Sequence, residues 1–217
     1  MTTGAGASGR DMRAAVAALR RADPVLRRLI DGCEPFAFRR TERRPFEALL
    51  RAIVYQQLSG RAAGAIHARV EALFDGDRPT PRALEALTAE QLRAAGLSRA
   101  KVLAVHDLAA KTRRGVVPGP RTVRGLSDEE VIERVVQVRG IGRWTGEMLL
   151  MHLGRPDVLP ATDLGIRRGF ARARGLDALP EPAEVLAYGE RWRPWRSVAS
   201  LYLWRAADLS AGDLPAE

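Results

Sequence analysis

Several kinds of residue and segment are scarce in this sequence, and each shortage excludes a class of protein. Cys33 is the only cysteine among 217 residues, so the chain has neither a disulfide framework nor an all-cysteine zinc or iron–sulfur site. No apolar run approaches the roughly 18 residues that a membrane-spanning helix needs. The first ten residues, MTTGAGASGR, lack the apolar stretch of a secretory signal and predict a flexible tail. We therefore expect a cytoplasmic protein.

Lysine is also scarce, although the chain is basic. The sequence has 35 Lys and Arg residues against 26 Asp and Glu residues, a net charge of +9. Only Lys101 and Lys111 are lysines. A genomic bias towards arginine codons accounts for most of that ratio, but it does not account for the net charge. The positive charge favours a polyanionic partner, most simply a nucleic acid.

Helical patterns dominate the chain. Apolar residues recur at spacings of three and four along segments that are expected to be helices. These segments include residues 11–23, 45–59, 61–74 and 98–114. N-capping side chains at Asp23, Thr88 and Ser127 mark further helix starts. No segment alternates for long enough to predict a strand. We expect an all-α fold of about ten to twelve helices joined by short loops.

The most informative stretch is VRGIGRWTGEMLL, residues 138–150. Gly140 and Gly142 separate two helical segments and allow a tight turn that a ligand can approach closely. The N–H groups of the second helix, with Arg143 beside them, suit a phosphate. Such a helix–hairpin–helix grips one DNA backbone without reading bases. An ordinary helical hairpin with a glycine cap is the alternative.

The segment DVLPATDLGIRRGFARARG, residues 157–175, places Asp163 at the start of an arginine-rich helix. The simplest interpretation of Asp163 is an N-cap, a role that Thr162 could share. A helix N-terminus favours an ionised carboxylate. Facing a cleft, that carboxylate can stabilise an oxocarbenium-like sugar, or align or deprotonate a water molecule.

The pairing of VRGIGRWTGEMLL with LPATDLGIRRGF resembles the helix–hairpin–helix (HhH-GPD) DNA glycosylases, and most of all the DNA-3-methyladenine glycosylase II branch. AIVYQQLSGRAAGAI, residues 52–66, is similar to an early helix pair of that family, and YGERWRPWRSVASLYLW, residues 188–204, is similar to its C-terminal stretch. The resemblance covers residues 11–208. It implies a base excision repair enzyme that flips an alkylated base, of the 3-methyladenine type, out of duplex DNA and hydrolyses its bond to deoxyribose.

By the same resemblance, Asp163 is the catalytic aspartate. Trp144 stands where bifunctional relatives carry a Schiff-base lysine, so a monofunctional enzyme without strand cleavage is implied. Trp144 and Trp204 match positions that line the base pocket, where an aromatic face attracts a positively charged alkylated base. Core packing is the alternative for both tryptophans.

The remaining site residues also follow from the resemblance. Gln56 matches a glutamine near the target base, and Met148 stands where a relative has a pocket tyrosine. Gln57 falls where a relative has an apolar wedge that fills the gap left by the flipped base. The polar side chain departs from that pattern and could instead bond to the orphan base. The residues expected at the DNA backbone or in the gap are Gln57, Gly140, Gly142, Arg143 and Thr145.

The family hairpin also holds a monovalent cation, Na⁺ or K⁺, through backbone carbonyls. The matching residues are Val136, Val138 and Ile141. No other cofactor is expected, and in particular no iron–sulfur cluster. The three histidines, His67, His106 and His152, share no metal-ligand spacing.

The implied architecture is two helical subdomains. Residues 46–153 form a helical barrel that carries the hairpin, at about residues 128–153. Residues 11–45 and 154–217 form the second subdomain, and residues 1–10 are the flexible tail. A cleft between the subdomains would hold the catalytic aspartate and the two pocket tryptophans.

Damaged double-stranded DNA is the expected partner, with no membrane and with a monomeric protein. Two alternatives stay open. A noncatalytic helix–hairpin–helix protein would bind DNA through the hairpin but would have no need of Asp163 beside aromatic residues. A glycosylase for deaminated or oxidised bases would rely on hydrogen bonds more than on cation–π contact, and Met148 and Gln57 are compatible with it.

Overall fold

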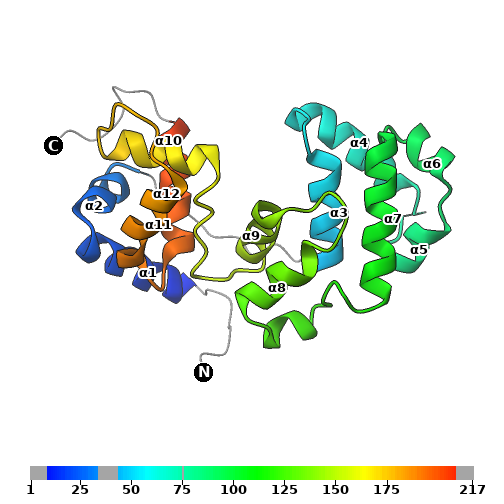
Figure 1. Cartoon of the computed structure of the whole chain (residues 1–217), viewed down its shortest axis with the longest axis horizontal. Helices are drawn as coiled ribbons and strands as arrows, with labels where there is room; N and C mark the ends of the chain where they lie inside the picture. Colours follow the sequence, from blue (N-terminus) through cyan, green and yellow to red (C-terminus); the bar gives the residue numbers. More distant parts are fainter. Residues whose placement is uncertain (1–8, 34–43, 75, 209–217) are drawn as a thin grey trace. The chain divides into compact units, whose positions relative to one another are not determined.

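The computed structural model describes residues 9–33, 44–74 and 76–208. These residues contain twelve α-helices, two short 3₁₀ helices and no strand (Figure 1). The all-α fold expected from the sequence is therefore confirmed. Within the described part of the chain, no helix has both the length and the apolar character needed to cross a membrane.

The chain folds into two compact units. Among the described residues, the first unit contains residues 44–149, and the second contains residues 9–33 together with residues 150–208. The last two residues of the predicted tail are helical in the second unit. Residues 1–8 of that tail lie outside the described residues.

The first unit is built around a long helix, α7. The helices of the first unit are α3 (Pro45–Tyr55), α4 (Gly60–Ala72), α5 (Pro81–Ala86), α6 (Ala89–Ala94), α7 (Arg99–Arg113), η1 (Thr122–Gly125), α8 (Asp128–Val135) and α9 (Arg143–His152). The last three residues of α9 belong to the second unit. Helices α3, α5 and α6 pack against α7. Capping boxes at Thr88 and Ser127 start α6 and α8, as predicted.

Helix α3 is shorter than its sequence pattern predicts. The apolar periodicity favours a helix over residues 45–59, but α3 ends at Tyr55. Gln56 leaves the helical region with ψ 132°, and Gln57 adopts φ +57°. Ser59 then caps α4, because its hydroxyl accepts the N–H of Ala62. The chain therefore turns sharply between α3 and α4.

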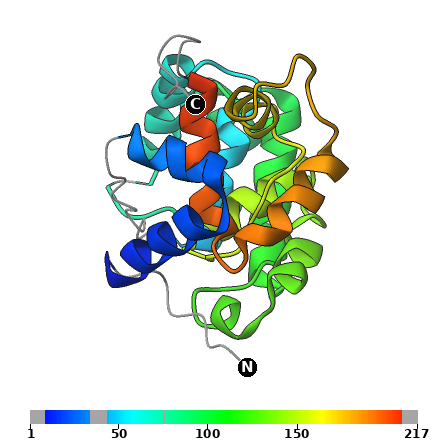
Figure 2. The ribbon, with the colours of Figure 1, turned by 90° about the vertical axis from the view of Figure 1, so that its left-hand side faces the viewer.

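The second unit is built around the contact between α10 and α12. Its helices are α1 (Gly9–Ala22), α2 (Pro24–Asp31), α10 (Leu164–Ala173), α11 (Pro182–Gly189), η2 (Glu190–Trp192) and α12 (Arg196–Asp208). Helices α1 and α2, in blue, cover one side of α12 (Figure 2). Phe170 and Leu203 are buried in the core of this unit. The carboxylate of Asp23, which caps α2 as predicted, is fully buried and accepts the indole N–H of Trp192 at 2.7 Å.

Candidate active site

Asp163 is the N-cap of α10, and two elements orient its carboxylate. Its Oδ1 atom accepts the backbone N–H of Ile166 at 3.0 Å, which is the capping bond. The same oxygen accepts the indole N–H of Trp204, from α12, at 2.8 Å. Both donors are neutral N–H groups, so they orient the carboxylate without adding a positive charge beside it. Two residues of the predicted site, Asp163 and Trp204, are therefore in direct contact.

Two glycines of α10 make this contact possible. A Cβ atom at Gly165 would lie 2.8 Å from Cδ1 of Trp204 and 3.0 Å from Oδ1 of Asp163. One turn later, a Cβ atom at Gly169 would lie 1.8 Å from the carbonyl oxygen of Leu203. The glycines let α12 approach α10 closely enough for Trp204 to reach the aspartate. Sequence reasoning missed both residues, and their signal was two glycines four residues apart on one helix face.

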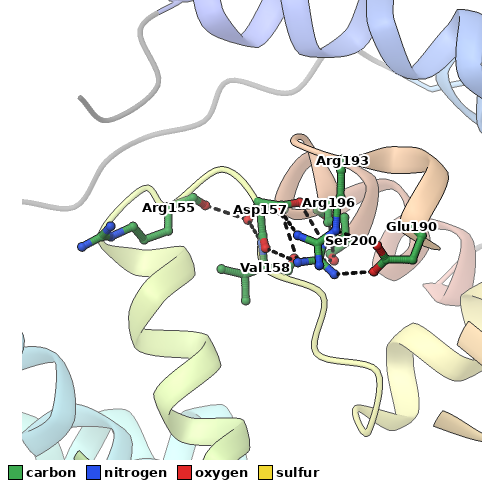
Figure 3. A network of polar contacts seen from close by, with 8 residues as sticks. Arg155, Asp157, Val158, Glu190, Arg193, Arg196 and Ser200 are labelled. Atoms are coloured by element: carbon green, nitrogen blue, oxygen red, sulfur yellow. Dashed lines mark hydrogen bonds and ion pairs between the residues drawn. The ribbon is translucent and has the colours of Figure 1, made fainter. Parts of the chain in front are cut away.

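The loop that leads to Asp163 is tied to the start of α12 (Figure 3). Arg196 donates from Nε to the Oδ1 atom of Asp157 at 2.7 Å and from a terminal nitrogen to its carbonyl at 3.0 Å. The hydroxyl of Ser197 donates to the carbonyl of Arg155 at 2.6 Å and accepts the N–H of Val158 at 2.9 Å. Helix α12 thus holds both the aspartate and the chain that precedes it.

In the first unit, the turn after α3 meets the hairpin. Gln56 donates from its side-chain nitrogen to the carbonyl of Gly140 at 2.8 Å. Gln57 is the only non-glycine residue in the described part of the chain with a positive φ, and its side chain is exposed. A left-handed backbone is unfavourable for a residue with a Cβ atom, so its surroundings must impose it. Gln56 and Gly140, both predicted site residues, are therefore joined.

The hairpin arginine already has acidic partners. Gly140 has φ +77°, as the tight turn requires. Arg143, the first residue of α9, donates to both carboxylate oxygens of Glu129 at 2.7 and 2.8 Å and lies 3.4 Å from a carboxylate oxygen of Glu147. The hydrogen bonds with Glu129 raise the pKa of Arg143 above its usual value and lower the pKa of Glu129. A DNA phosphate that binds this guanidinium would compete with Glu129.

The other predicted residues of α9 differ in exposure. Trp144 is 45% exposed, and Met148, one turn later, is partly buried. Thr145 is only 5% exposed. The contact of Thr145 with the DNA backbone stays a prediction. Trp144 and Met148 belong to the first unit and Asp163 to the second, so the shared cleft stays a prediction.

The predicted cation site consists of backbone carbonyls in the turn after α8. Val136 is the C-cap of α8, and the carbonyl of Val138 accepts the N–H of Ile141 at 3.0 Å. Carbonyl oxygens at a helix C-terminus carry partial negative charge and therefore suit a cation. In the described residues, no group of three or more His, Cys, Asp or Glu side chains could hold a metal ion. A cation at this turn would therefore depend on the carbonyls.

Both lysines lie outside the sequence motifs that predict the site, but both contact the site loops. Lys101 donates to the carbonyl of Gln56 at 2.8 Å. Lys111 donates to the carbonyl of Gln137, at the entrance to the hairpin. The sequence signal was their rarity in an arginine-rich chain.

Comparison with known families gives a consistent result. The family model described as the HhH-GPD superfamily base excision DNA repair protein matches residues 50–194. The chain is 40% identical over 171 residues to DNA-3-methyladenine glycosylase 1 of Schizosaccharomyces pombe, which covers 78% of this chain and 75% of that protein. It is 32% identical over 170 residues to DNA-3-methyladenine glycosylase 2 of Escherichia coli, covering 73% of this chain and 56% of that protein.

Solved structures show the same similarity. The 3-methyladenine DNA glycosylase of Schizosaccharomyces pombe in complex with abasic DNA superimposes with a TM-score of 0.83 at 37% identity, covering 91% of this chain and 98% of that one. The DNA-3-methyladenine glycosidase of Bacillus halodurans superimposes with a TM-score of 0.81 at 35% identity, covering 89% of each chain. The similarity therefore extends over nearly the whole chain.

Proposed function

The chain belongs to the HhH-GPD superfamily of base excision DNA repair proteins and is a DNA glycosylase for alkylated bases of the 3-methyladenine type, and from this premise we propose how its residues perform the reaction. Asp163 is the catalytic residue. Its bonds from Ile166 and Trp204 are the observation that carries the proposal, because they fix a carboxylate at a helix N-terminus before substrate arrives.

The reaction breaks the bond between the base and C1′ of deoxyribose. An alkylated purine in DNA carries a positive charge, so it leaves with the bonding electron pair as a neutral base. The sugar then develops oxocarbenium-like charge, which the carboxylate of Asp163 stabilises. Water adds to C1′ and loses a proton, which Asp163 accepts and passes to solvent. The products are the free base and an abasic site.

The enzyme is monofunctional. Strand cleavage by the lyase route needs an amine that forms a Schiff base with the sugar. Trp144 occupies the position of that amine in bifunctional relatives. The chain has only two lysines, and each donates to a backbone carbonyl of the first unit, Lys101 to Gln56 and Lys111 to Gln137. Both amines are therefore distant from Asp163 in the sequence, and each is bonded to a carbonyl of the first unit.

The half-exposed Trp144 offers the flipped base an aromatic face, which attracts its positive charge. Gln56 and Met148 complete the first unit's share of the base pocket. The indole N–H of Trp204 donates to Asp163, so Trp204 would contact the base through its aromatic ring and not through its N–H. We expect the protein to act as a monomer, because Asp163, the hairpin and the turn at Gln57 all come from one chain.

The hairpin binds the DNA backbone through Gly140, Gly142 and Arg143, and Gln57 fills the gap left by the flipped base. The exposed left-handed turn at Gln57 supports this role, because it projects a polar side chain from the surface. The carbonyls of Val136, Val138 and Ile141 would hold Na⁺ or K⁺, which would add positive charge at the backbone contact.

Base release from methylated duplex DNA tests the assignment. Asp163→Asn keeps an N-capping side chain but removes the negative charge. It should bind duplex DNA with an abasic site as wild type does, and release 3-methyladenine at least about 100-fold more slowly. Asp177→Asn, an exposed loop variant with the same charge change, should release base at the wild-type rate.

Equal release by Asp163→Asn and wild type would overturn the catalytic role of Asp163. A wild-type protein that binds duplex but releases no methylated base would favour a noncatalytic DNA-binding protein. Release of hypoxanthine or uracil in preference to 3-methyladenine would instead favour the glycosylase for deaminated bases.

A further inference from the structure

Helix α7 carries both lysines of the chain, and Lys101 holds the end of α3. Its ammonium donates to the carbonyl of Val54 at 2.7 Å and to that of Gln56 at 2.8 Å. The last carbonyls of a helix have no partner within the helix, and a positive charge beside them is favourable. Burial lowers the pKa of Lys101 from its ordinary value. The partly buried ammonium therefore joins α7 to the end of α3.

The turn that Lys101 contacts leads directly into the strained residue. Gln56 is held at its carbonyl by Lys101 and at its side chain by the carbonyl of Gly140. The next residue, Gln57, has φ +57° and an exposed side chain. A left-handed backbone at a residue with a Cβ atom persists only where its neighbours impose it. The two bonds on Gln56 fix the residue immediately before the strain.

A second clamp on α7 holds the hairpin in the same way. Lys111 donates to Asp107 at 2.8 Å and to the carbonyl of Gln137, and Asp107 accepts the backbone N–H of Arg139 at 2.7 Å. Burial acts to raise the pKa of Asp107, but hydrogen bonds from Lys111 and from the Arg139 N–H hold it below its ordinary value. Helix α7 thus fixes the hairpin entrance as well as the turn after α3.

We propose that Lys101 is a positioning residue for base flipping, which locks the Gln56–Gln57 turn so that Gln57 is held ready to enter the gap left by the flipped base. This inference rests on the proposed function of Gln57. Lysine suits the position because its compact ammonium points three donors in different directions and can reach two carbonyls at once. The planar fork of arginine is wider and is shaped for carboxylates and phosphates. In a chain whose other basic residues are arginines, lysine stands where ammonium geometry is used.

The proposed role of Lys101 affects base flipping and not cleavage of the glycosidic bond, so the experiment measures the two steps separately. A paired lesion must be unstacked and unpaired before excision, whereas a lesion in an unpaired bubble is already partly extruded. Two duplexes are compared under single-turnover conditions. One carries 7-methylguanine paired with cytosine, and the other carries it in a short unpaired bubble.

Lys101→Met, which keeps the length of the side chain, should release the paired lesion about tenfold more slowly and the bubble lesion at close to the wild-type rate. Lys101→Arg keeps the charge but not the ammonium geometry, and it should show the same selective loss. Arg99→Met, an exposed substitution two residues earlier on α7, is the matched control and should match wild type on both duplexes. The thermal unfolding midpoint of every variant is recorded.

An equal loss on both duplexes, or no loss on either, by Lys101→Met overturns the positioning role. If Lys101→Met does not fold, Lys101→Arg decides the question, and wild-type release of the paired lesion by that variant overturns it. If wild type releases neither 7-methylguanine from either duplex nor 3-methyladenine from methylated DNA, the proposed function fails, which is a different result from the failure of the Lys101 inference.

Discussion

The aspartate of the second unit and the loops of the first unit are held in place by different physical means. Asp163 accepts the N–H groups of Ile166 and Trp204, and α10 approaches α12 closely at two glycines: Gly165 lies beside the ring of Trp204, and Gly169 lies beside the backbone carbonyl of Leu203. The loops at Gln56 and at the hairpin are held by charged side chains that reach backbone carbonyls. The helices at Asp163 depend on close packing, whereas the loops of the first unit depend on ionic hydrogen bonds, as does the loop before Asp163, where Arg196 holds Asp157.

The difference matches what each region does. A carboxylate that stabilises a transition state must already be in place, because reorienting it during the reaction would raise the barrier. Backbone packing meets this requirement, since close-packed interiors do not deform gradually. The loops of the first unit are instead held by charged side chains, and in the proposed function a different charge of that unit, Arg143, meets the DNA phosphate. Substitutions should therefore disturb stability in the second unit and DNA handling in the first.

Gly169→Ala should have the largest effect, because it tests the packed region directly. The new Cβ atom would lie 1.8 Å from the Leu203 carbonyl, and neither helix backbone can move without losing its packing. We expect a loss of about 3 kcal/mol in the free energy of unfolding, measured by urea denaturation. Gly119→Ala is the control, because nothing lies within 4 Å of the position that its new methyl group would take. A Gly169→Ala protein as stable as wild type would show that α10 and α12 can separate easily.

Trp204→Phe should come next, because it removes one N–H from the aspartate and keeps an aromatic ring. The lost bond to Asp163 should lower kcat for base release by about tenfold to a hundredfold, with a loss in stability of about 1 kcal/mol. Affinity for abasic duplex should be unchanged. Trp195→Phe, in the same unit and also partly buried, is the matched control. If kcat is unchanged in Trp204→Phe, the indole N–H does not position the aspartate.

The comparison also shows what sequence patterns can predict. Caps at Asp23, Thr88 and Ser127 are confirmed, because a cap involves residues within one turn of each other. Asp163 as an N-cap follows for the same reason. The resemblance placed Asp163 and Trp204 in one site, but their bond joins residues 41 positions apart. Such a bond depends on how closely two helices pack, and the local pattern shows only that Gly165 and Gly169 leave room on one face of α10, not which helix fills it.

The first unit gives the same lesson with charged residues. The α3 periodicity predicts a helix through residue 59, because residues 56–59 include no glycine or proline that would end a helix locally. The stop at Tyr55 instead comes with contacts made by Lys101 and Gly140, 45 and 84 positions from Gln56. The pairing of Arg143 with Glu129 was missed for a similar reason, because the hairpin turn brings the two side chains together. Long-range contacts therefore decide the details of both loops.

Glu129→Gln should have the smallest effect, and it tests whether charge controls the first unit. In the free protein Glu129 occupies the guanidinium that the proposed function gives to a phosphate. Exposed ion pairs are weak, so releasing Arg143 should tighten binding to undamaged duplex by about threefold. Arg143→Ala should act in the opposite direction, weaken binding to all sequences alike and reduce the salt dependence by about one phosphate contact.

The measurement is a duplex titration at several salt concentrations, with Glu133→Gln as the control. Glu133 is exposed on the same helix, α8, so its loss changes the net charge equally without touching the hairpin arginine. Equal tightening by both variants would mean that net charge alone acts, and that Arg143 is not released to the backbone. Tightening by Glu129→Gln alone, abolished when Arg143→Ala is added, would show that the hairpin exchanges a carboxylate for a phosphate when DNA binds.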